Sequence, residues 1–228
     1  MEKIYFSAEN LIYDCENFHL DVSFECPQGS MTSIVGPSGS GKSTVLRLIA
    51  GFEKASGTSR IMLDGDEVTN LSPAKRGVGM VFQNANLFNH LRVDDNVAYG
   101  LRCAGMNKKE SRELACDFLK KFNLSGFEKR SPETLSGGEA QRVSLARTLI
   151  TKPKLILFDE PLSALDAPLR KKLAQEIRSL QIEFGFTGIM VTHDINEAKT
   201  VSDKIILLKQ GKITWQGEAK DFKEEMIS

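Results

Sequence analysis

The amino-acid sequence predicts an α/β fold with a largely parallel sheet, a flanking antiparallel sheet and one helical insertion. Short apolar segments alternate with helical segments through most of the 228 residues, which is typical of parallel strands joined by crossover helices. The first part of the chain instead shows strand-like alternation and turn residues, which favour antiparallel pairing. Because no internal repeat or linker is evident, we expect a single domain. Its core with the antiparallel β subdomain comprises residues 1–84 and 151–228, and its helical insertion comprises residues 85–150.

The individual elements follow from the spacing of apolar residues. Phe18, Leu20 and Val22 alternate with other residues as on a strand with one buried face, whereas Leu114 and Phe118 recur four apart, as on one face of a helix. The expected strands are residues 4–11, 18–26, 31–35, 60–63, 76–83, 155–158, 188–192, 204–208 and 212–215. The expected helices are residues 44–50, 93–101, 108–122, 139–150, 166–184 and 196–201, followed by a short charged helix at the end of the chain.

Composition excludes several classes of protein. Lys plus Arg and Asp plus Glu number 30 each, so no basic surplus indicates a nucleic-acid partner. The cysteines lack the spacing of a zinc site or a redox pair, and we expect reduced thiols. The N-terminus has no signal-peptide pattern, and the apolar runs are far shorter than a membrane span. Any role at a membrane is therefore expected to be peripheral.

One stretch carries the clearest chemical signal, because it fits the phosphate-binding loop pattern. Its residues are Gly36, Pro37, Ser38, Gly39, Ser40, Gly41, Lys42, Ser43 and Thr44. The glycines allow backbone N–H groups to surround phosphate oxygens, and the following helix adds a partial positive charge. Lys42 would reach the β and γ phosphates, and the Ser43 hydroxyl would bind Mg²⁺. A glycine-rich turn that binds nothing is the alternative, which the strand before the loop and the helix after it disfavour.

This loop alone leaves kinases, GTPases and motor ATPases open, but later segments narrow the choice. The segments 135–139, 155–160 and 163–166, followed by His193, resemble in order and spacing the ATP-binding subunits of ABC transporters. The resemblance extends from about Tyr13 to Gly217. It implies a P-loop NTPase fold with a RecA-like core, ATP and Mg²⁺ as ligands, and ATP hydrolysis coupled to transport.

The amino-acid sequence of residues 76–97 resembles that of one branch of the family, the ATPases of bacterial importers for ferric iron, thiamine, polyamines or maltose. Residues 212–217 and the short length are most similar to the thiamine type. The chain stops soon after the core, so we expect no C-terminal regulatory domain. The resemblance implies integral membrane permease subunits and, indirectly, an extracytoplasmic substrate-binding protein. It places the chain at the cytoplasmic face of the cell membrane and leaves the cargo open.

The resemblance assigns four further residues to the hydrolytic site. Asp159 ends a buried strand and would hold Mg²⁺ or its water. Glu160 would act as the general base or orient the attacking water. Gln83 would contact Mg²⁺ and that water, and His193 would hydrogen-bond the γ-phosphate. The alternatives are two carboxylates that only cap a helix, and a solvated amide at a strand end.

A second copy of the chain is implied by the segment around residue 136. Ser136, Gly137 and Gly138, with Glu139 where many family members have glutamine, would present a helix start to the γ-phosphate held by the partner subunit. Two ATP molecules would then lie between two copies in a head-to-tail homodimer. Asp166 would help to connect the two sites.

Two aromatic residues upstream of the loop compete for stacking on adenine. Tyr13 is favoured by its offset from Gly36, because the alternation of Phe18 with Leu20 is typical of core. Neither assignment would exclude GTP, since a flat aromatic surface does not read the edge of the base.

Three rival functions are kept open: a soluble ABC-type ATPase without a transport role, an exporter or lipid-extraction ATPase, and a nucleotide-binding module that does not hydrolyse. The segment after Gln83 separates the first two from an importer, because Leu87, Phe88 and Leu91 would receive a short helix of a membrane partner. The presence of Glu160 and His193 disfavours the third.

Overall fold

The computed structural model describes residues 3–16 and 18–227, and confirms the predicted α/β fold. Within this described part, ten strands form one mixed sheet in the order β5-β4-β1-β2-β10-β9-β3-β8-β7-β6. The strands are β1 (Ile4–Cys15), β2 (Phe18–Pro27), β3 (Met31–Val35), β4 (Arg60–Leu63), β5 (Asp66–Glu67), β6 (Val78–Phe82), β7 (Leu155–Asp159), β8 (Thr187–Val191), β9 (Lys204–Lys209) and β10 (Lys212–Glu218). The α-helices are α1 (Lys42–Ala50), α2 (Val93–Cys103), α3 (Lys108–Lys121), α4 (Gly137–Leu149), α5 (Ala167–Phe184) and α6 (Ile195–Val201).

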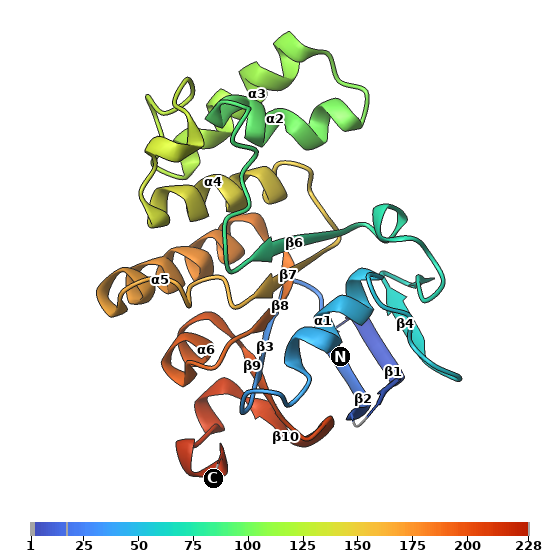
Figure 1. Cartoon of the computed structure of the whole chain (residues 1–228). Coiled ribbons are helices and arrows are strands. Elements are labelled where there is room, and N and C mark those ends of the chain that lie inside the picture. The colour runs from blue at the N-terminus through green and yellow to red at the C-terminus, as the bar shows by residue number, and fades with distance from the viewer. Residues whose placement is uncertain (1–2, 17, 228) are drawn as a thin grey trace.

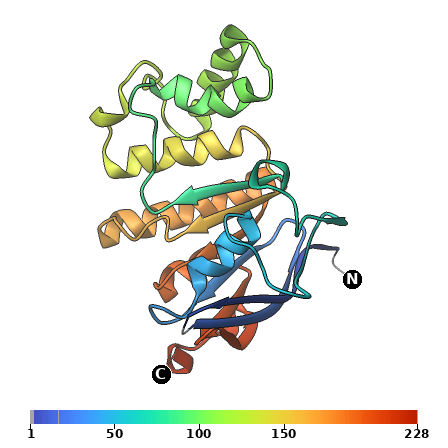
Figure 2. The same cartoon turned by 45° about the vertical axis from the view of Figure 1, so that its right-hand side comes forward.

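The parallel part of the sheet comprises β6, β7, β8, β3 and β9, each paired in parallel with its neighbour. Its strands are covered on both faces, and successive residues enter different cores. Leu155 and Leu157 pack in a core that includes α1, whereas Ile156 and Phe158 pack in a core that includes α4 and α5. This is the period of two that a strand imposes on its side chains. Figures 1 and 2 show the helices on the two sides of these strands.

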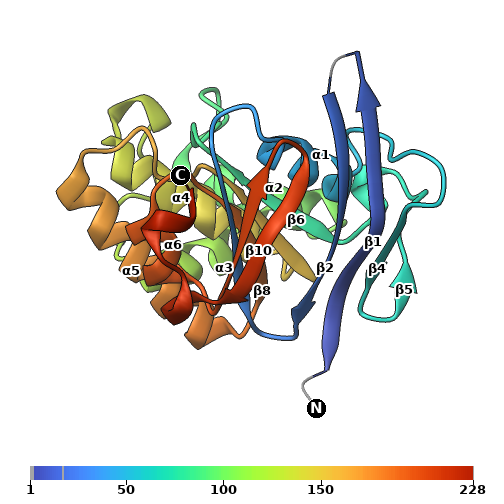
Figure 3. The same ribbon diagram turned by 90° about the horizontal axis from the view of Figure 1, so that it is seen from below.

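The antiparallel part comprises β5, β4, β1 and β2, and it is continuous with the rest through β10 (Figure 3). β10 pairs in parallel with β2 at one position, Lys212 with Asp21. β1 continues to Cys15, past the predicted end at Leu11. A bulge between Ala8 and Leu11, with Asn10 at φ +48°, lets the pairing with β2 resume beyond it.

The helices α2, α3 and α4 lie together at one end of the molecule (Figure 1). Val97, Leu119 and Val143 of these helices are fully buried, in the same core as Val81 of β6 and Phe158 of β7. The helical segment is therefore packed on the edge of the sheet where β6 and β7 lie.

The end of the chain differs from the expectation of a short charged helix. It forms two short 3₁₀ segments instead, Ala219–Asp221 and Glu224–Ile227. Phe222 between them is buried against Trp215, with ring centroids 5.2 Å apart, so packing of one aromatic side chain overrides helix propensity here. Among the described residues, no helix is long and apolar enough to cross a membrane.

Candidate functional site

The loop at residues 36–41 connects the carboxyl end of β3 to the N-terminus of α1, as the sequence predicts. Gly36 is buried, and a Cβ atom there would collide with the carbonyl oxygen of Leu208. Gly41 caps α1 at φ +101°, and a Cβ atom there would lie 2.5 Å from the ring of Phe18. Both positions therefore require glycine, which lets the backbone close around an anion at the helix start.

Lys42 is the first residue of α1, and its ammonium group is turned back into the loop. Its Nζ donates hydrogen bonds to the carbonyl oxygens of Gly36 and Pro37, each at 2.9 Å. Burial lowers the pKa of Lys42, while the nearby carboxylates of Glu160 and Asp159 act in the opposite direction. A buried cation among acceptors is available to phosphate oxygens without a large rearrangement.

A cavity of about 430 Å³ opens over this loop. It is lined by Phe18, Ser38, Gly39, Gly41, Lys42, Ser43, Thr44, Glu160 and His193. Residues more than 110 positions apart in sequence therefore meet at one site, because β3, β7 and β8 are neighbours and end at the same edge of the sheet. This edge is where ligands bind in open parallel sheets.

Ser43 and Asp159 bring two side-chain oxygen atoms together next to the loop. The Ser43 hydroxyl donates a hydrogen bond of 2.9 Å to Oδ1 of Asp159. Gln83 directly follows β6, whose last residue, Phe82, pairs with Asp159. The Gln83 side chain is exposed and does not line the cavity. A hydroxyl, a carboxylate and an amide oxygen form a donor set that suits Mg²⁺, so these residues fit the predicted ion.

Glu160 and His193 line the cavity over the phosphate loop and lie just after the ends of β7 and β8. Nδ1 of His193 lies 3.0 Å from Oε2 of Glu160. Glu160 has a left-handed backbone, with φ +46°, and its N–H donates to the carbonyl of Val191. Its own carbonyl accepts hydrogen bonds from the N–H and the hydroxyl of Ser163. Backbone strain in a non-glycine residue, held by bonds on both sides, is typical of a functional position.

The two aromatic candidates occupy different places. The Phe18 ring packs against the core that contains Leu20, as its alternation predicts, and it also lies against Gly41 and lines the cavity. Tyr13 is half-buried on β1 and is not among the lining residues. The carboxylate of Glu53 raises the pKa of Tyr13 most. Stacking of adenine on Tyr13 stays a prediction, and Phe18 is the aromatic side chain next to the phosphate loop.

Ser136 caps the N-terminus of α4, as expected of a residue at a helix start. Ser136 and Glu139 form a capping box, in which the Glu139 N–H donates to the Ser136 hydroxyl oxygen at 3.4 Å and the Ser136 N–H donates to Oε2 of Glu139 at 2.7 Å. The Ser136 hydroxyl also donates to this Oε2, at 2.8 Å. These bonds lower the pKa of Glu139. Gly137 is exposed and Gly138 is buried against Leu169, and none of the four residues 136–139 lines the cavity over Lys42.

Asp166 caps α5 in the same manner, accepting a hydrogen bond of 2.9 Å from the N–H of Leu169. Its side chain is exposed, and it also lies outside the lining of the cavity. Within one chain, the phosphate loop and the two helix starts at Ser136 and Asp166 are therefore separate. Glu160, His193 and Phe18 line the same cavity as the loop, and Asp159 is bonded to Ser43 of the loop.

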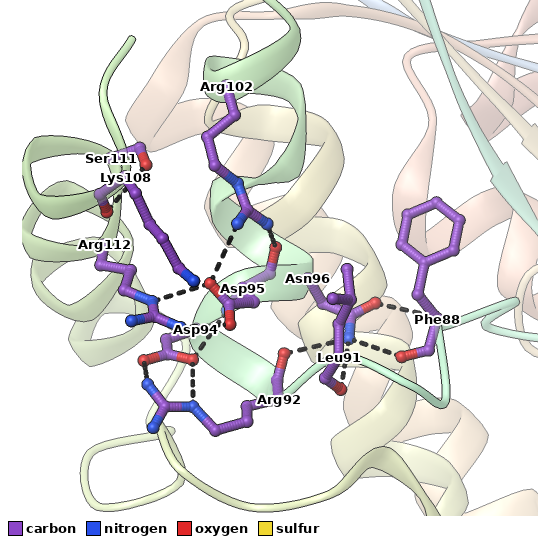
Figure 4. A network of polar contacts seen from close by, with 10 residues as sticks. All are labelled: Phe88, Leu91, Arg92, Asp94, Asp95, Asn96, Arg102, Lys108, Ser111 and Arg112. Carbon is purple, nitrogen blue, oxygen red and sulfur yellow. Dashed lines mark hydrogen bonds and ion pairs between the residues drawn. The ribbon is translucent and has the colours of Figure 1, made fainter.

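The segment after Gln83 is held on α2 by one fully buried amide (Figure 4). Nδ2 of Asn96 donates to the carbonyls of Phe88, Leu91 and Arg92, and Oδ1 accepts from the Phe88 N–H at 2.8 Å. The Phe88 ring lies 4.6 Å from the ring of Tyr99, a side chain that is 42 % exposed. The segment therefore has a defined shape and presents an aromatic pair at the surface.

Arginine and aspartate pairs brace the same region (Figure 4). Asp95 is buried and accepts from Arg112 at 2.7 Å and forms an ion pair with Arg102 at 3.2 Å. The Arg112 guanidinium holds the pKa of Asp95 below its usual value. Asp94 pairs with Arg92. The Arg112–Asp95 contact joins α3 to α2 next to the segment that Asn96 holds.

Sequence reasoning missed two residues that support the turn carrying His193. Glu197 is 95 % buried, and its Oε2 accepts a hydrogen bond of 3.1 Å from the Thr192 hydroxyl. Burial raises the pKa of Glu197 to about 7. Arg170 donates to Asp194, the residue after His193. The sequence signal that could have identified Arg170 and Glu197 is a charged residue on the apolar face of a helix, α5 and α6 respectively, and that signal is weak.

The fold and the loop define a nucleoside-triphosphate-binding α/β protein of the P-loop type. Comparison with known proteins then narrows the class: a family model described as ABC transporter matches residues 20–163. The chain belongs to this ABC transporter ATP-binding family, which confirms the resemblance seen in the sequence.

Among curated relatives, the chain is 48 % identical over 193 residues to a protein named "Fe(3+) ions import ATP-binding protein FbpC" of Photorhabdus laumondii, covering 85 % of this chain and 55 % of that protein. The protein of the same name from Rhizobium etli is 47 % identical over 208 residues, covering 91 % and 59 %. The one from Escherichia coli O157:H7 is 44 % identical, covering 91 % and 60 %. The chain thus spans little more than half the length of these relatives.

Two solved structures share the whole architecture. The cbiO1 protein of Clostridium perfringens, described as part of the ABC transporter complex cbiONQ, has a TM-score of 0.87 at 28 % identity, covering 96 % of this chain and 90 % of that one. A dimeric post-hydrolysis state of the ATP-binding cassette MJ0796 bound to ADP and Pi has a TM-score of 0.80 at 33 % identity, covering 95 % and 100 %.

Proposed function

We propose that this chain is the ATP-hydrolysing subunit of an ABC import system, converting ATP and water to ADP and phosphate. The observation that carries the proposal is the Glu160–His193 pair, with atoms 3.0 Å apart, facing a buried Lys42 across one cavity. A carboxylate next to an imidazole can accept a proton from water or orient it, while Lys42 stabilises charge on the transferred phosphate. The names of the relatives and the family match support the same activity.

In this proposal each residue has one task. Lys42 moves from the carbonyls of Gly36 and Pro37 to the β and γ phosphates. Glu160 orients the attacking water and accepts its proton, and His193 holds the γ-phosphate. Ser43, Asp159 and Gln83 are the residues that would hold Mg²⁺, which neutralises phosphate charge when bound.

We propose a head-to-tail homodimer because the capped helix start at Ser136 lies outside the cavity that contains Lys42. A helix start favours an anion, and the start of α4 would offer such a site to an anion that this chain does not itself supply there. A second copy would bring its γ-phosphate to Ser136, Gly137 and Gly138, next to Glu139. Asp166, exposed at the start of α5, would lie in the same interface. The dimeric state described for MJ0796 is consistent with this arrangement.

We also propose that membrane permease subunits dock on the segment after Gln83. Asn96 fixes this segment, and Phe88 and Tyr99 give it an apolar surface that suits a short amphipathic helix of a partner. Residues 85–150 would act as the subdomain that carries both this surface and Ser136. The protein would thus be peripheral at the cytoplasmic face of the membrane and would reach an extracytoplasmic binding protein only indirectly. The names of the relatives favour ferric iron as cargo, which partner subunits would select.

The proposal is tested by the Glu160→Gln variant. ATP binding should remain, while turnover should fall by about 100-fold or more because the general base is neutralised. With ATP and Mg²⁺, size-exclusion chromatography should then detect a trapped dimer. Glu183→Gln, an exposed carboxylate on α5 that pairs with Lys121, is the control and should hydrolyse at the wild-type rate. Hydrolysis by Glu160→Gln at that rate would contradict the assignment.

A further inference from the structure

Arg170, in the first turns of α5, connects two loops that border the nucleotide cavity. Its Nη2 donates a hydrogen bond of 2.9 Å to the carbonyl of Leu165. Its Nη1 donates a bond of 3.1 Å to Oδ2 of Asp194. One rigid, planar guanidinium therefore spans the residue before Asp166 and the residue after His193.

Each end of this bridge lies close to a group that the site needs. On one side, Leu165 belongs to the turn at residues 163–166, whose Ser163 is bonded to the carbonyl of Glu160. On the other side, Asp194 also caps α6, accepting hydrogen bonds from the N–H groups of Asn196 and Glu197. Arg170 therefore bonds to both the 163–166 turn and the 192–194 turn, in addition to the direct contact between Glu160 and His193.

The surroundings show that Arg170 is more than a surface ion pair. A cavity of about 520 Å³ between α5 and α6 is lined by Arg170, Asp194 and Glu197, among others. Nε of Arg170 and Oε1 of Glu197 are buried and have no hydrogen-bond partner among the residues that the structure describes. The guanidinium thus keeps an unused donor at the cavity where the two helices meet, and this arrangement permits an alternative bonding pattern.

We propose that Arg170 is a positioning residue that makes the 163–166 turn and the 192–194 turn move together. Contact of a second copy with Asp166 would then set the position of His193 over the γ-phosphate. This inference rests on the two-copy site of the proposed function. In this inference, Arg170 couples binding of the second copy to the position of the hydrolytic residue His193.

The same helix offers a matched control. Arg178 also pairs with an aspartate, Asp203, through two bonds, with Nη1–Oδ2 and Nη2–Oδ1 distances of 3.0 and 2.6 Å. The Arg178 and Arg170 side chains are 30 % and 25 % exposed. Arg178 does not contact either turn of the site and does not line the nucleotide cavity. The Arg178 variant therefore shows the effect of removing an arginine from α5 without breaking the link between the 163–166 and 192–194 turns.

The test compares Arg170→Ala with Arg178→Ala. We expect both variants to bind ATP with affinities within about twofold of wild type, because the loop at Gly36–Thr44 is intact. Turnover at saturating ATP should fall about tenfold or more in Arg170→Ala and less than twofold in Arg178→Ala. Arg170→Lys, which keeps the charge but lacks the planar fork, should fold normally and recover only part of the turnover. Equal turnover in the two alanine variants would overturn the proposal.

The Asp194→Asn variant tests the other end of the bridge. If Arg170 acts through Asp194, the double variant Arg170→Ala/Asp194→Asn should lose no more turnover than the more damaging single variant. If the fold-losses of the two single variants multiply in the double variant, the two residues act independently and the bridge is contradicted. The Glu160→Gln variant separates the proposal of a two-copy site from the proposed role of Arg170. Failure of that protein to form an ATP-trapped dimer would defeat the two-copy site. A normal dimer together with unaffected Arg170→Ala turnover would defeat only the role of Arg170.

Discussion

At the scale of single residues, the site depends on side chains held by a few specific bonds. Glu160 has a left-handed backbone because its N–H is bonded to Val191 and its carbonyl to Ser163. That conformation turns the carboxylate toward His193 at the end of a neighbouring strand. Strain of this kind persists only where surrounding bonds over-determine it. The chemistry of Glu160 is therefore inseparable from the register of β7 and β8.

Glu197 leads to a prediction about pH. Burial raises the pKa of Glu197 from 4.5, the value of an unperturbed glutamate, to about 7 in the folded chain. The charged groups around it are Asp194, Arg170 and Glu160. Between these two pKa values the folded state binds more protons than the unfolded state. The stability contributed by protonated Glu197 is therefore present below about pH 4.5 and is lost as the pH rises through about 7.

The Glu197→Gln variant removes this titration and keeps an acceptor for the Thr192 hydroxyl. We expect its free energy of unfolding, relative to wild type, to increase from pH 5 to pH 8 by up to about 3 kcal/mol, at about 1.4 kcal/mol per pKa unit. Urea denaturation at both pH values measures this difference. A difference between variant and wild type that is independent of pH would show that Glu197 does not titrate in this window.

At the scale of elements, the two capped helix starts carry the surface that a second copy would meet. The capping box of α4 places the Glu139 carboxylate on the Ser136 hydroxyl, so a negative charge lies where a partner's phosphate is proposed to bind. Glutamine maintains a capping box without that charge. Glu139 thus stabilises the helix start while it opposes an incoming anion.

We therefore predict that Glu139→Gln dimerises more readily. In the Glu160→Gln background, the ATP concentration that gives half of the trapped dimer should fall roughly two- to fivefold, the range for one charge at a helix N-terminus. Light scattering during an ATP titration measures it. Glu139→Ala, which removes the charge and the capping acceptor together, should lower the melting temperature as well. If Glu139→Gln leaves the ATP concentration for half-maximal dimer unchanged, the proposed binding of the partner's γ-phosphate at the start of α4 is contradicted.

At the scale of the whole molecule, sequence reasoning succeeded where the signal is local. The loop at Gly36–Thr44 and the cap at Ser136 depend on neighbouring residues, so pattern and spacing predict them. The end of β1 and the 3₁₀ segments at the C-terminus were predicted wrongly, because a bulge at Asn10 and burial of Phe222 are consequences of tertiary packing. Arg170 was missed for the same reason, since its two acceptors come together only when α6 packs on α5.

The central claim is that hydrolysis takes place in a site shared by two copies. Ser136→Arg tests it most directly, because it places bulk and charge at the start of α4 and leaves the loop containing Lys42 intact. We predict that Ser136→Arg binds ATP with wild-type affinity in a calorimetric titration but neither dimerises nor hydrolyses. Mixing it with Lys42→Ala chains should restore some turnover if one intact composite site is sufficient. Normal hydrolysis by Ser136→Arg alone would contradict the claim, since a site completed by the partner's helix start cannot accept arginine against the transferred phosphate.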